Sequence, residues 1–172
     1  MESSGQGGIS SVEIREFAER DWPQVWGIVR EVVREQETFV YDPAMTEDEA
    51  RAVWIEPGPG LTVVAVDGER VLGTAKTGAN RPGPGAHVAT ASFMVAADAR
   101  GRGVGRALCR HALDWARARG FAGMQFNAVV ETNHAAVELY RKLGFEVIGT
   151  VPGAFESPSL GRVGLHVMYH QF

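Results

Sequence analysis

The most informative segment of this chain reads Ser92-Phe93-Met94-Val95-Ala96-Ala97-Asp98-Ala99-Arg100-Gly101-Arg102-Gly103-Val104-Gly105-Arg106-Ala107-Leu108. It predicts an apolar strand, a glycine-rich turn and a helix, in that order. Glycines in the turn carry no Cβ atoms, so several backbone N–H groups can point into one small space. The helix that begins there adds unpaired N–H groups and the positive end of its dipole. Such a turn can bind phosphate through its backbone, and the arginines of the segment add positive charge.

Two common phosphate-binding loops do not match this segment. A P-loop ends in Gly-Lys-Ser/Thr, and none occurs in the chain. The dinucleotide fingerprint needs a third glycine, but counting from Gly101 and Gly103 places Arg106 at that position. The spacing that is present is Arg-x-x-Gly-x-Gly, formed by Arg100, Gly103 and Gly105. The alternative at this point is an Ala/Gly-rich turn that carries solvated arginines.

Length and composition indicate one globular domain. The chain has 172 residues, 45% of them hydrophobic, and a domain of this size buries roughly 70% of its unfolded surface. A net charge of −4 argues against a nucleic-acid-binding protein held by overall charge. A single cysteine, Cys109, excludes an internal disulfide and favours a cytoplasmic protein. Because Cys109 falls within a predicted helix, we expect a core residue there and not a nucleophile.

The sequence predicts no membrane-spanning segment and one domain that follows a short tail. No apolar run approaches the roughly 20 residues that span a bilayer, so no membrane partner is expected. Residues 1–10 are rich in Gly and Ser and lack the apolar core of a signal peptide. We expect a disordered tail over 1–10 and a single domain over 11–172.

Hydrophobic periodicity predicts the order of the elements. Strands are expected over 12–17, 61–66, 70–77, 87–95, 124–129, 145–151 and 163–170. Helices are expected over 22–33, with Asp21 as cap, and over 46–54, 104–119 and 133–143. The loop 152–155 separates the last two strands. The order β-α-α-β-β-β-α-β-α-β-β predicts a mixed, mostly antiparallel sheet with helices on both faces.

The helix over 133–143 is the second informative element. Asn133 and Tyr140 are two turns apart and lie on one face. Ala136, between them, is small enough to let a ligand approach. The structural alternative makes Asn133 a helix cap and Tyr140 a core residue. Capping does not prevent Asn133 from binding a ligand as well.

These residues also carry a family resemblance. Thr132-Asn133-His134-Ala135-Ala136-Val137-Glu138-Leu139-Tyr140-Arg141-Lys142-Leu143-Gly144-Phe145 resembles one signature of the GCN5-related N-acetyltransferase (GNAT) superfamily. The Arg-x-x-Gly-x-Gly spacing resembles another, and the two follow in the family's order and separation. The element order matches over nearly the whole chain. The resemblance implies an α/β fold of GNAT type, with a twisted, mostly antiparallel sheet flanked by helices on both faces.

The resemblance also implies a cosubstrate, acetyl-CoA, and a site for it. The strand that ends at Met94 and Val95 would splay from the strand 124–129, and the pantetheine would pair with backbone at these two residues. The pyrophosphate would rest on backbone amides of the turn, namely those of Arg100, Gly101, Arg102, Gly103, Val104, Gly105 and Arg106. Asn133 would hold the pantetheine arm alongside Ala136. Tyr140 would point its hydroxyl at the thioester sulfur.

The chemistry of such a site can be stated independently. A neutral amine attacks the thioester carbonyl directly, and the Val95 N–H is suitably placed to stabilise the oxyanion. The leaving thiolate, whose thiol has a pKa of about 8.5 if it is like that of cysteine, can take a proton from Tyr140, since an ordinary tyrosine has a pKa of about 10. The sequence does not identify a general base, because no motif spacing supports any of the candidates Glu131, Glu156 and His166. No His/Cys/Asp cluster has metal-ligand spacing, so no metal is expected.

The acceptor pocket implied by the resemblance is lined by Phe39, Val40, Tyr41, Pro152 and Phe155, with Arg162 and His166 as further candidates. The alternative is that Phe39 and Tyr41 merely seal the domain. The aromatic lining favours a small or moderately apolar amine.

A closer resemblance concerns the segments 125–133 and 149–155. They resemble a subgroup that includes fungal N-acetyltransferases of proline analogues such as azetidine-2-carboxylate. Asn127 matches one of two asparagines of that subgroup's catalytic and acceptor site, while Thr90 stands where the other is expected. Threonine offers one hydroxyl where asparagine offers a donor and an acceptor. Asn127 could instead be a strand residue bonded to backbone.

Three functions follow from this reading. The leading one is an acetyl-CoA-dependent N-acetyltransferase that acts on a small, amino-acid-like amine. The alternatives are an acetyltransferase of protein N-termini or lysines, and an acyl-CoA-binding sensor without chemistry. A homodimer through the C-terminal strands is a further option.

Overall fold

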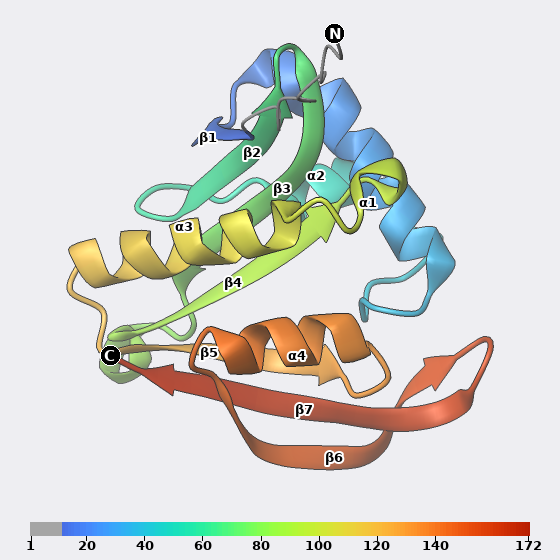
Figure 1. The fold of residues 1–172 in the computed structure, drawn as a ribbon, viewed down its shortest axis with the longest axis vertical. Helices are drawn as coiled ribbons and strands as arrows, with labels where there is room; N and C mark the ends of the chain where they lie inside the picture. Colours follow the sequence, from blue (N-terminus) through green and yellow to red (C-terminus); the bar gives the residue numbers. More distant parts are fainter. Residues whose placement is uncertain (1–11) are drawn as a thin grey trace, which may run out of the picture.

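Strands and helices follow one another in the predicted order (Figure 1). The computed structural model describes residues 12–172, so the tail expected over 1–10 lies outside the described residues. The strands are β1 (Glu13–Glu16), β2 (Leu61–Asp67), β3 (Arg70–Ala79), β4 (Val88–Val95), β5 (Gly123–Val130), β6 (Glu146–Ser157) and β7 (Gly161–Gln171). The helices are α1 (Trp22–Glu35), α2 (Glu47–Trp54), α3 (Val104–Ala118) and α4 (His134–Lys142). Short 3₁₀ turns lie at Glu19–Asp21, Gly83–Gly85 and Ala97–Ala99.

Within the described part of the chain, the strands form a seven-stranded sheet in the order β1-β2-β3-β4-β5-β7-β6. All neighbouring pairs are antiparallel except β4 and β5, which are parallel and joined through α3. The expected mixed, mostly antiparallel sheet is therefore confirmed. Its one parallel pair lies at the centre, between the two halves of the chain.

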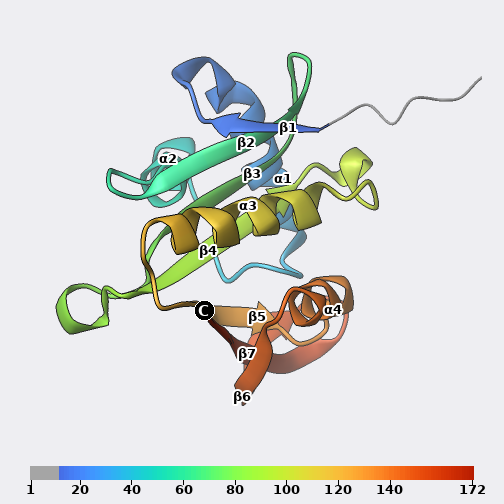
Figure 2. The same ribbon diagram turned by 60° about the vertical axis from the view of Figure 1, so that its left-hand side comes forward.

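The two faces of the sheet carry different helices (Figures 1 and 2). Along β2, Val64 and Val66 pack in a cluster with α1 and α2, whereas Val63 and Ala65 pack with α3. Successive strand residues point to opposite faces, so this alternation assigns α1 and α2 to one face and α3 to the other. Residues of α3 and α4, among them Leu113 and Val137, share a further cluster with Phe126 of β5.

The start of α2 confirms a predicted capping box. The Thr46 hydroxyl accepts a hydrogen bond from the Glu49 N–H at 3.2 Å, and the Glu49 carboxylate accepts one from the Thr46 N–H at 2.8 Å. Two otherwise unpaired donors at the helix start are satisfied in this way.

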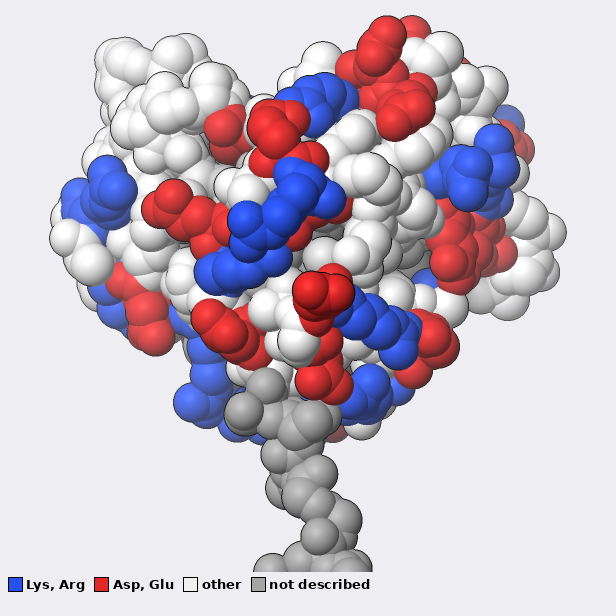
Figure 3. Space-filling view, turned by 90° about the horizontal axis from the view of Figure 1, so that it is seen from above, with Lys and Arg blue, Asp and Glu red and all other residues white. Residues whose placement is uncertain are grey.

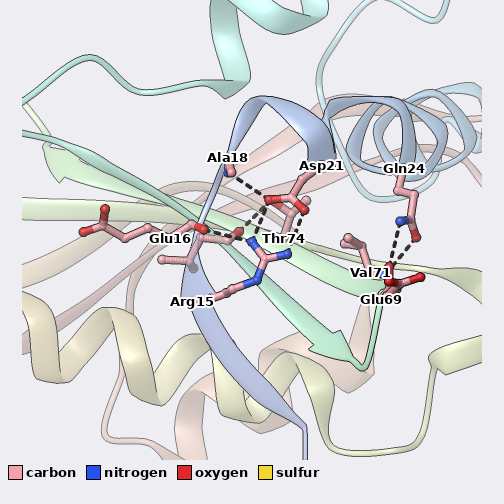
Figure 4. A network of polar contacts seen from close by, with 9 residues as sticks. Arg15, Glu16, Ala18, Asp21, Gln24, Glu69, Val71 and Thr74 are labelled. Atoms are coloured by element: carbon pink, nitrogen blue, oxygen red, sulfur yellow. Dashed lines mark hydrogen bonds and ion pairs between the residues drawn. The ribbon is translucent and has the colours of Figure 1, made fainter.

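Asp21 does not cap α1 as expected (Figure 4). Its buried carboxylate accepts hydrogen bonds from Arg15 at 2.7 and 2.8 Å and from the Ala18 N–H at 2.8 Å. The arginine competes for the carboxylate because β1 and the start of α1 lie side by side. Asp21 thus fastens β1 to the turn before α1.

Gly73 lets α3 approach the sheet closely. A Cβ atom at this residue of β3 would lie 2.9 Å from Val104 Cγ1 and 3.0 Å from the Met94 carbonyl oxygen. Both distances are shorter than normal contacts, so the first turn of α3 rests directly on the backbone of β3. This approach places the glycine-rich turn at the end of β4.

The C-terminal hairpin differs from its prediction. Residues 152–155, expected as a loop, belong to β6, which runs to Ser157 with an irregular register between Val151 and Phe155. Because β6 is an edge strand, Pro152 can be accommodated without loss of a sheet hydrogen bond. The turn itself lies over 158–160.

Basic and acidic side chains are interspersed on the face seen in Figure 3. This face shows no broad region of one charge, in keeping with the modest net charge of −4. Among the described residues, no helix has the length and apolar character needed to cross a membrane.

Candidate active site

The site lies where β4 and β5 separate. Their backbone pairing is confined to Val88 with Gly123 and Ala89 with Met124, at the start of both strands. Beyond that point lies a cavity of about 880 Å³, lined by both strands, the glycine-rich turn, α4 and the segment after α1. The cleft expected between these strands is therefore present.

The backbone of β4 faces this cleft with alternate residues. The Ala96 N–H donates to Leu72 O and the Val88 carbonyl accepts from Asn80 N–H, so even-numbered residues of β4 pair with β3. The N–H and C=O groups of Phe93 and Val95 consequently point into the gap between β4 and β5, where the two strands no longer pair. Of the two residues expected to pair with pantetheine, Val95 thus presents free backbone groups, while the backbone of Met94 faces β3 and its side chain is buried.

The turn before α3 has the conformation expected of a phosphate-binding turn. Gly101 and Gly103 have φ of +78° and +80°, and Gly103 is the N-cap of α3. A Cβ atom on Gly105 would lie 3.8 Å from Val95 and 3.9 Å from Leu139, so this glycine forms part of the cavity floor. The helix N-terminus and the bare backbone of the turn lie at the same end of the cavity.

The arginines of the turn differ in their surroundings. Arg100 lines the cavity and forms hydrogen bonds of 3.0 and 3.1 Å with both oxygens of Glu35, at the end of α1. Arg106 also lines the cavity, from the first turn of α3. Arg102 does not line the cavity, and its Nη2 atom lies 3.8 Å from Oδ2 of Asp67. Of the three arginines in the segment, Arg100 and Arg106 therefore bring charge to the cavity, and Lys142 of α4 lines it as well.

Asn133 and Tyr140 both line the cavity from α4. The Asn133 side-chain oxygen accepts from the Ala136 N–H at 3.4 Å as a helix cap, which leaves its amide N–H groups for another partner. The Tyr140 ring packs against Phe126 at 4.6 Å and Phe93 at 6.2 Å between ring centroids. Asn133 therefore caps α4 and Tyr140 packs against core aromatics, as the structural alternative expected, and both residues also line the cavity.

Burial raises the pKa of the Tyr140 hydroxyl, and the nearby Cys109 raises it further. No described residue forms a hydrogen bond with this hydroxyl, and no buried polar side-chain atom among the described residues lacks a partner. The hydroxyl is therefore open to the cavity and stays protonated at neutral pH. Burial also raises the pKa of the Cys109 thiol to about 12, which agrees with its prediction as a core residue.

The other end of the cavity is aromatic. Phe39 and Tyr41 stack at 5.8 Å, and Phe39 meets the buried Trp54 edge-on at 6.3 Å. Thr90 and Asn127 line the same cavity from β4 and β5. Phe155, expected among the acceptor residues, is instead buried in β6 and does not line the cavity. Its loop prediction failed because the strand continues through it.

The three candidate bases do not line the cavity. Glu131 accepts a hydrogen bond from the Gly164 N–H at 2.7 Å, and His166 is bonded to Thr150 at 2.6 Å. Glu156 lies 3.9 Å from Arg162 on the exposed edge strand. No group of residues suited to hold a metal ion is found in the part of the chain that the structure describes.

Three contributors to the site were not predicted from the sequence. Glu35 lines the cavity beside Arg100, Asn80 pairs with Asn127, and Glu37 joins the segment after α1 to the last hairpin. Each acts through a partner distant in the sequence, so no local spacing signals it.

The model of the acetyltransferase (GNAT) family matches residues 13–145. The chain belongs to this family. The match includes the cavity-lining parts of β4, α3, β5 and α4, and so extends the resemblance carried by the two motifs to most of the domain.

Relatives of this GNAT chain include enzymes of bacteria and yeast. An L-methionine sulfoximine/L-methionine sulfone acetyltransferase of Pseudomonas aeruginosa is 30% identical over 147 residues, which are 83% of this chain and 84% of the relative. N-acetyltransferase aca1 of Schizosaccharomyces pombe is 28% identical over 69% of this chain, but the match spans only 64% of the yeast protein. A streptothricin acetyltransferase of Streptomyces lavendulae is 39% identical over 44% of this chain, and the match spans 38% of that protein.

Solved structures agree with this GNAT fold. A GCN5-related N-acetyltransferase from Kribbella flavida has a TM-score of 0.91 and 55% identity, over 94% of this chain and 98% of that one. A phosphinothricin acetyltransferase from Sinorhizobium meliloti, solved in complex with AcCoA, has a TM-score of 0.82 and 25% identity over 94% of this chain and 88% of that one. The predicted fold class is confirmed.

Proposed function

We propose that this protein transfers the acetyl group of acetyl-CoA directly to the amine of a small molecule. The observation that carries the proposal is one continuous cavity. It joins the glycine-rich turn at the start of α3 to the Tyr140 hydroxyl and to the aromatic pair Phe39 and Tyr41. A diphosphate-binding end, a proton donor and an acceptor end thus share one space.

The residues present fit acetyl-CoA. Positive φ at Gly101 and Gly103 and the unpaired N–H groups of α3 suit a pyrophosphate, with Arg100 and Arg106 adding charge. The Val95 backbone groups and the free Asn133 amide N–H suit the amide groups of a pantetheine arm. When bound, acetyl-CoA supplies the activated acyl group. The complex with AcCoA in the Sinorhizobium meliloti relative supports the same ligand here.

Two groups of this chain would support the transfer. The Val95 N–H would donate to the carbonyl oxygen as negative charge develops there, which is the most effective place for a fixed donor. Tyr140, kept protonated by burial, would give its proton to the departing thiolate. None of the candidate bases Glu131, Glu156 and His166 lines the cavity. We therefore expect the amine to lose its proton to solvent and to bind in its neutral form.

A small acceptor is favoured by the aromatic lining of the cavity. Phe39 and Tyr41 stack on each other and line it, which suits a compact, moderately apolar amine. The relatives named for methionine sulfone, streptothricin and phosphinothricin support the same class. Specificity for imino acids such as azetidine-2-carboxylate stays a prediction.

A thiol-release assay over a panel of amines tests the proposal. We expect free CoA to form when acetyl-CoA is mixed with the protein and small amino acids, and mass spectrometry should find the acetylated amine. Release with peptides alone would favour a protein acetyltransferase. Tight acetyl-CoA binding in calorimetry without turnover of any amine would favour a sensor.

A further inference from the structure

Three amide side chains meet beside the acceptor end of the cavity. Asn80 and Asn127 form a reciprocal pair, with N–O distances of 2.7 and 3.2 Å, although they are 47 residues apart. Gln125 donates a third bond to the Asn127 side-chain oxygen at 3.0 Å. The register of the sheet, which aligns Val88 with Gly123, turns the side chains of all three amide residues to the same face as Thr90.

These bonds decide what Asn127 can offer to a ligand. A side-chain amide oxygen has two lone pairs, and at Asn127 both are taken, one by Asn80 and one by Gln125. The Asn127 nitrogen uses one N–H on Asn80 and keeps the other. Asn127 lines the cavity, and the one group of its side-chain amide left for a ligand is a hydrogen-bond donor. The Thr90 hydroxyl, which lines the same cavity, can donate as well.

The charges around the cavity point the same way. Among the described lining residues the one carboxylate is Glu35, which is engaged by Arg100 at the far end. Nothing described at the acceptor end could pair with a second cationic group of a ligand. A group with lone pairs and no protons is the natural complement of fixed N–H donors.

We infer that Asn80 is a positioning residue that makes this site specific for amines bearing a carboxylate, that is, for α-amino acids. By filling the Asn127 oxygen, it keeps the Asn127 N–H turned toward the cavity. Without Asn80 the Asn127 amide can rotate and present its oxygen, which repels a carboxylate. The inference rests on the proposed acetyltransferase function and names the acceptor class for it.

The test compares one amino acid with its decarboxylated counterpart. The acceptors are L-methionine sulfone and the amine that remains when its carboxylate is removed, each assayed with acetyl-CoA. We expect the wild type to have at least about tenfold higher kcat/KM for the amino acid, the size of effect expected from a charge-assisted hydrogen bond. The variant is Asn80→Ala, which can neither donate to nor accept from Asn127. His87→Ala, an exposed residue of the same hairpin, is the matched control.

We expect Asn80→Ala to raise KM for the amino acid about tenfold, leaving KM for acetyl-CoA and the turnover of the decarboxylated amine within about twofold. Asn127→Asp, nearly the same shape, should lose the amino acid preference altogether. Thermal unfolding followed by circular dichroism confirms that each variant is folded. Equal effects on both acceptors would overturn the inference, because a merely structural role would not distinguish them.

The outcomes separate the inference from the function beneath it. A wild type that acetylates the decarboxylated amine as well as the amino acid contradicts the carboxylate specificity alone. A wild type that binds acetyl-CoA but acetylates no amine contradicts the proposed function, and the inference with it.

Discussion

The Glu37 carboxylate accepts a hydrogen bond from the Ser157 hydroxyl at 2.6 Å, although the two residues are 120 positions apart in the chain. Its other oxygen accepts from the Ser159 N–H at 3.2 Å. These bonds hold the pKa of Glu37 below its usual range. They fasten the segment that carries Phe39 and Tyr41 to the tip of the β6–β7 hairpin, and so fix the aromatic end of the cavity.

Replacing Glu37 by Gln should therefore loosen the acceptor end. We expect KM for the amine to rise about three- to tenfold, with KM for acetyl-CoA unchanged, because the turn at α3 is not involved. Glu31→Gln, on the exposed side of α1, should change neither constant. A shift in KM for acetyl-CoA as large as that for the amine would argue against this division. The contact is complete at neutral pH and is lost only in acid, as Glu37 gains its proton.

Tyr140→Phe tests the proton donor. We expect kcat to fall about 100-fold with little change in KM for acetyl-CoA, since the ring packing stays and the proton is lost. Tyr169→Phe, on β7, is the matched control. Because the pKa of Tyr140 is raised, its hydroxyl stays protonated until well above pH 10, so kcat should show no alkaline fall from this residue below that pH. An unchanged kcat in the phenylalanine variant would exclude the acid role.

Gly103→Ala tests the phosphate-binding turn. At φ of +80° an alanine costs about 1–2 kcal/mol, and relief of that strain would move the N–H groups of the turn. We expect a lower melting temperature and weaker acetyl-CoA binding in calorimetry, with KM for the amine little changed. Gly27→Ala is the contrasting control, because Gly27 lies within α1 with open space around it, and alanine there should raise stability by about 0.5–1 kcal/mol. Unweakened binding in Gly103→Ala would show that the turn does not hold the diphosphate.

Asp21→Asn should destabilise the fold at neutral pH. The Asp21 carboxylate is buried against Arg15, whose hydrogen bonds hold the pKa of Asp21 below its usual range. A carboxylate with a lowered folded-state pKa contributes stability above its unfolded pKa of about 3.9, and this contribution is lost as the pH falls through the folded-state pKa. We expect a loss of about 1–3 kcal/mol in urea unfolding at pH 7, shrinking toward pH 3. The exposed Glu69→Gln should show no such dependence, and a difference that persists unchanged at pH 3 would contradict this assignment.

Local signals allowed much of this protein to be predicted. Element order, the Thr46 capping box, the glycine-rich turn before α3 and the Asn133–Tyr140 face all depend on residues a few positions apart. At such separations backbone preference and side-chain periodicity act directly, and the chain has few alternatives. The cleft residues on β4 could be predicted in the same way, because β4 runs directly into the glycine-rich turn.

Tertiary packing alone decided the rest. Asp21 binds Arg15 and does not cap α1. Strand β6 continues through Pro152, so Phe155 is buried in the sheet and does not line the cavity. Arg100 forms hydrogen bonds with Glu35. The pairs Asn80 with Asn127 and Glu37 with Ser157 join segments that no periodicity connects. Their partners meet only because β4 and β5 part and the last hairpin reaches the segment after α1. Sequence spacing reports which neighbours share a helix face or a strand, whereas contacts between distant segments depend on how whole elements pack.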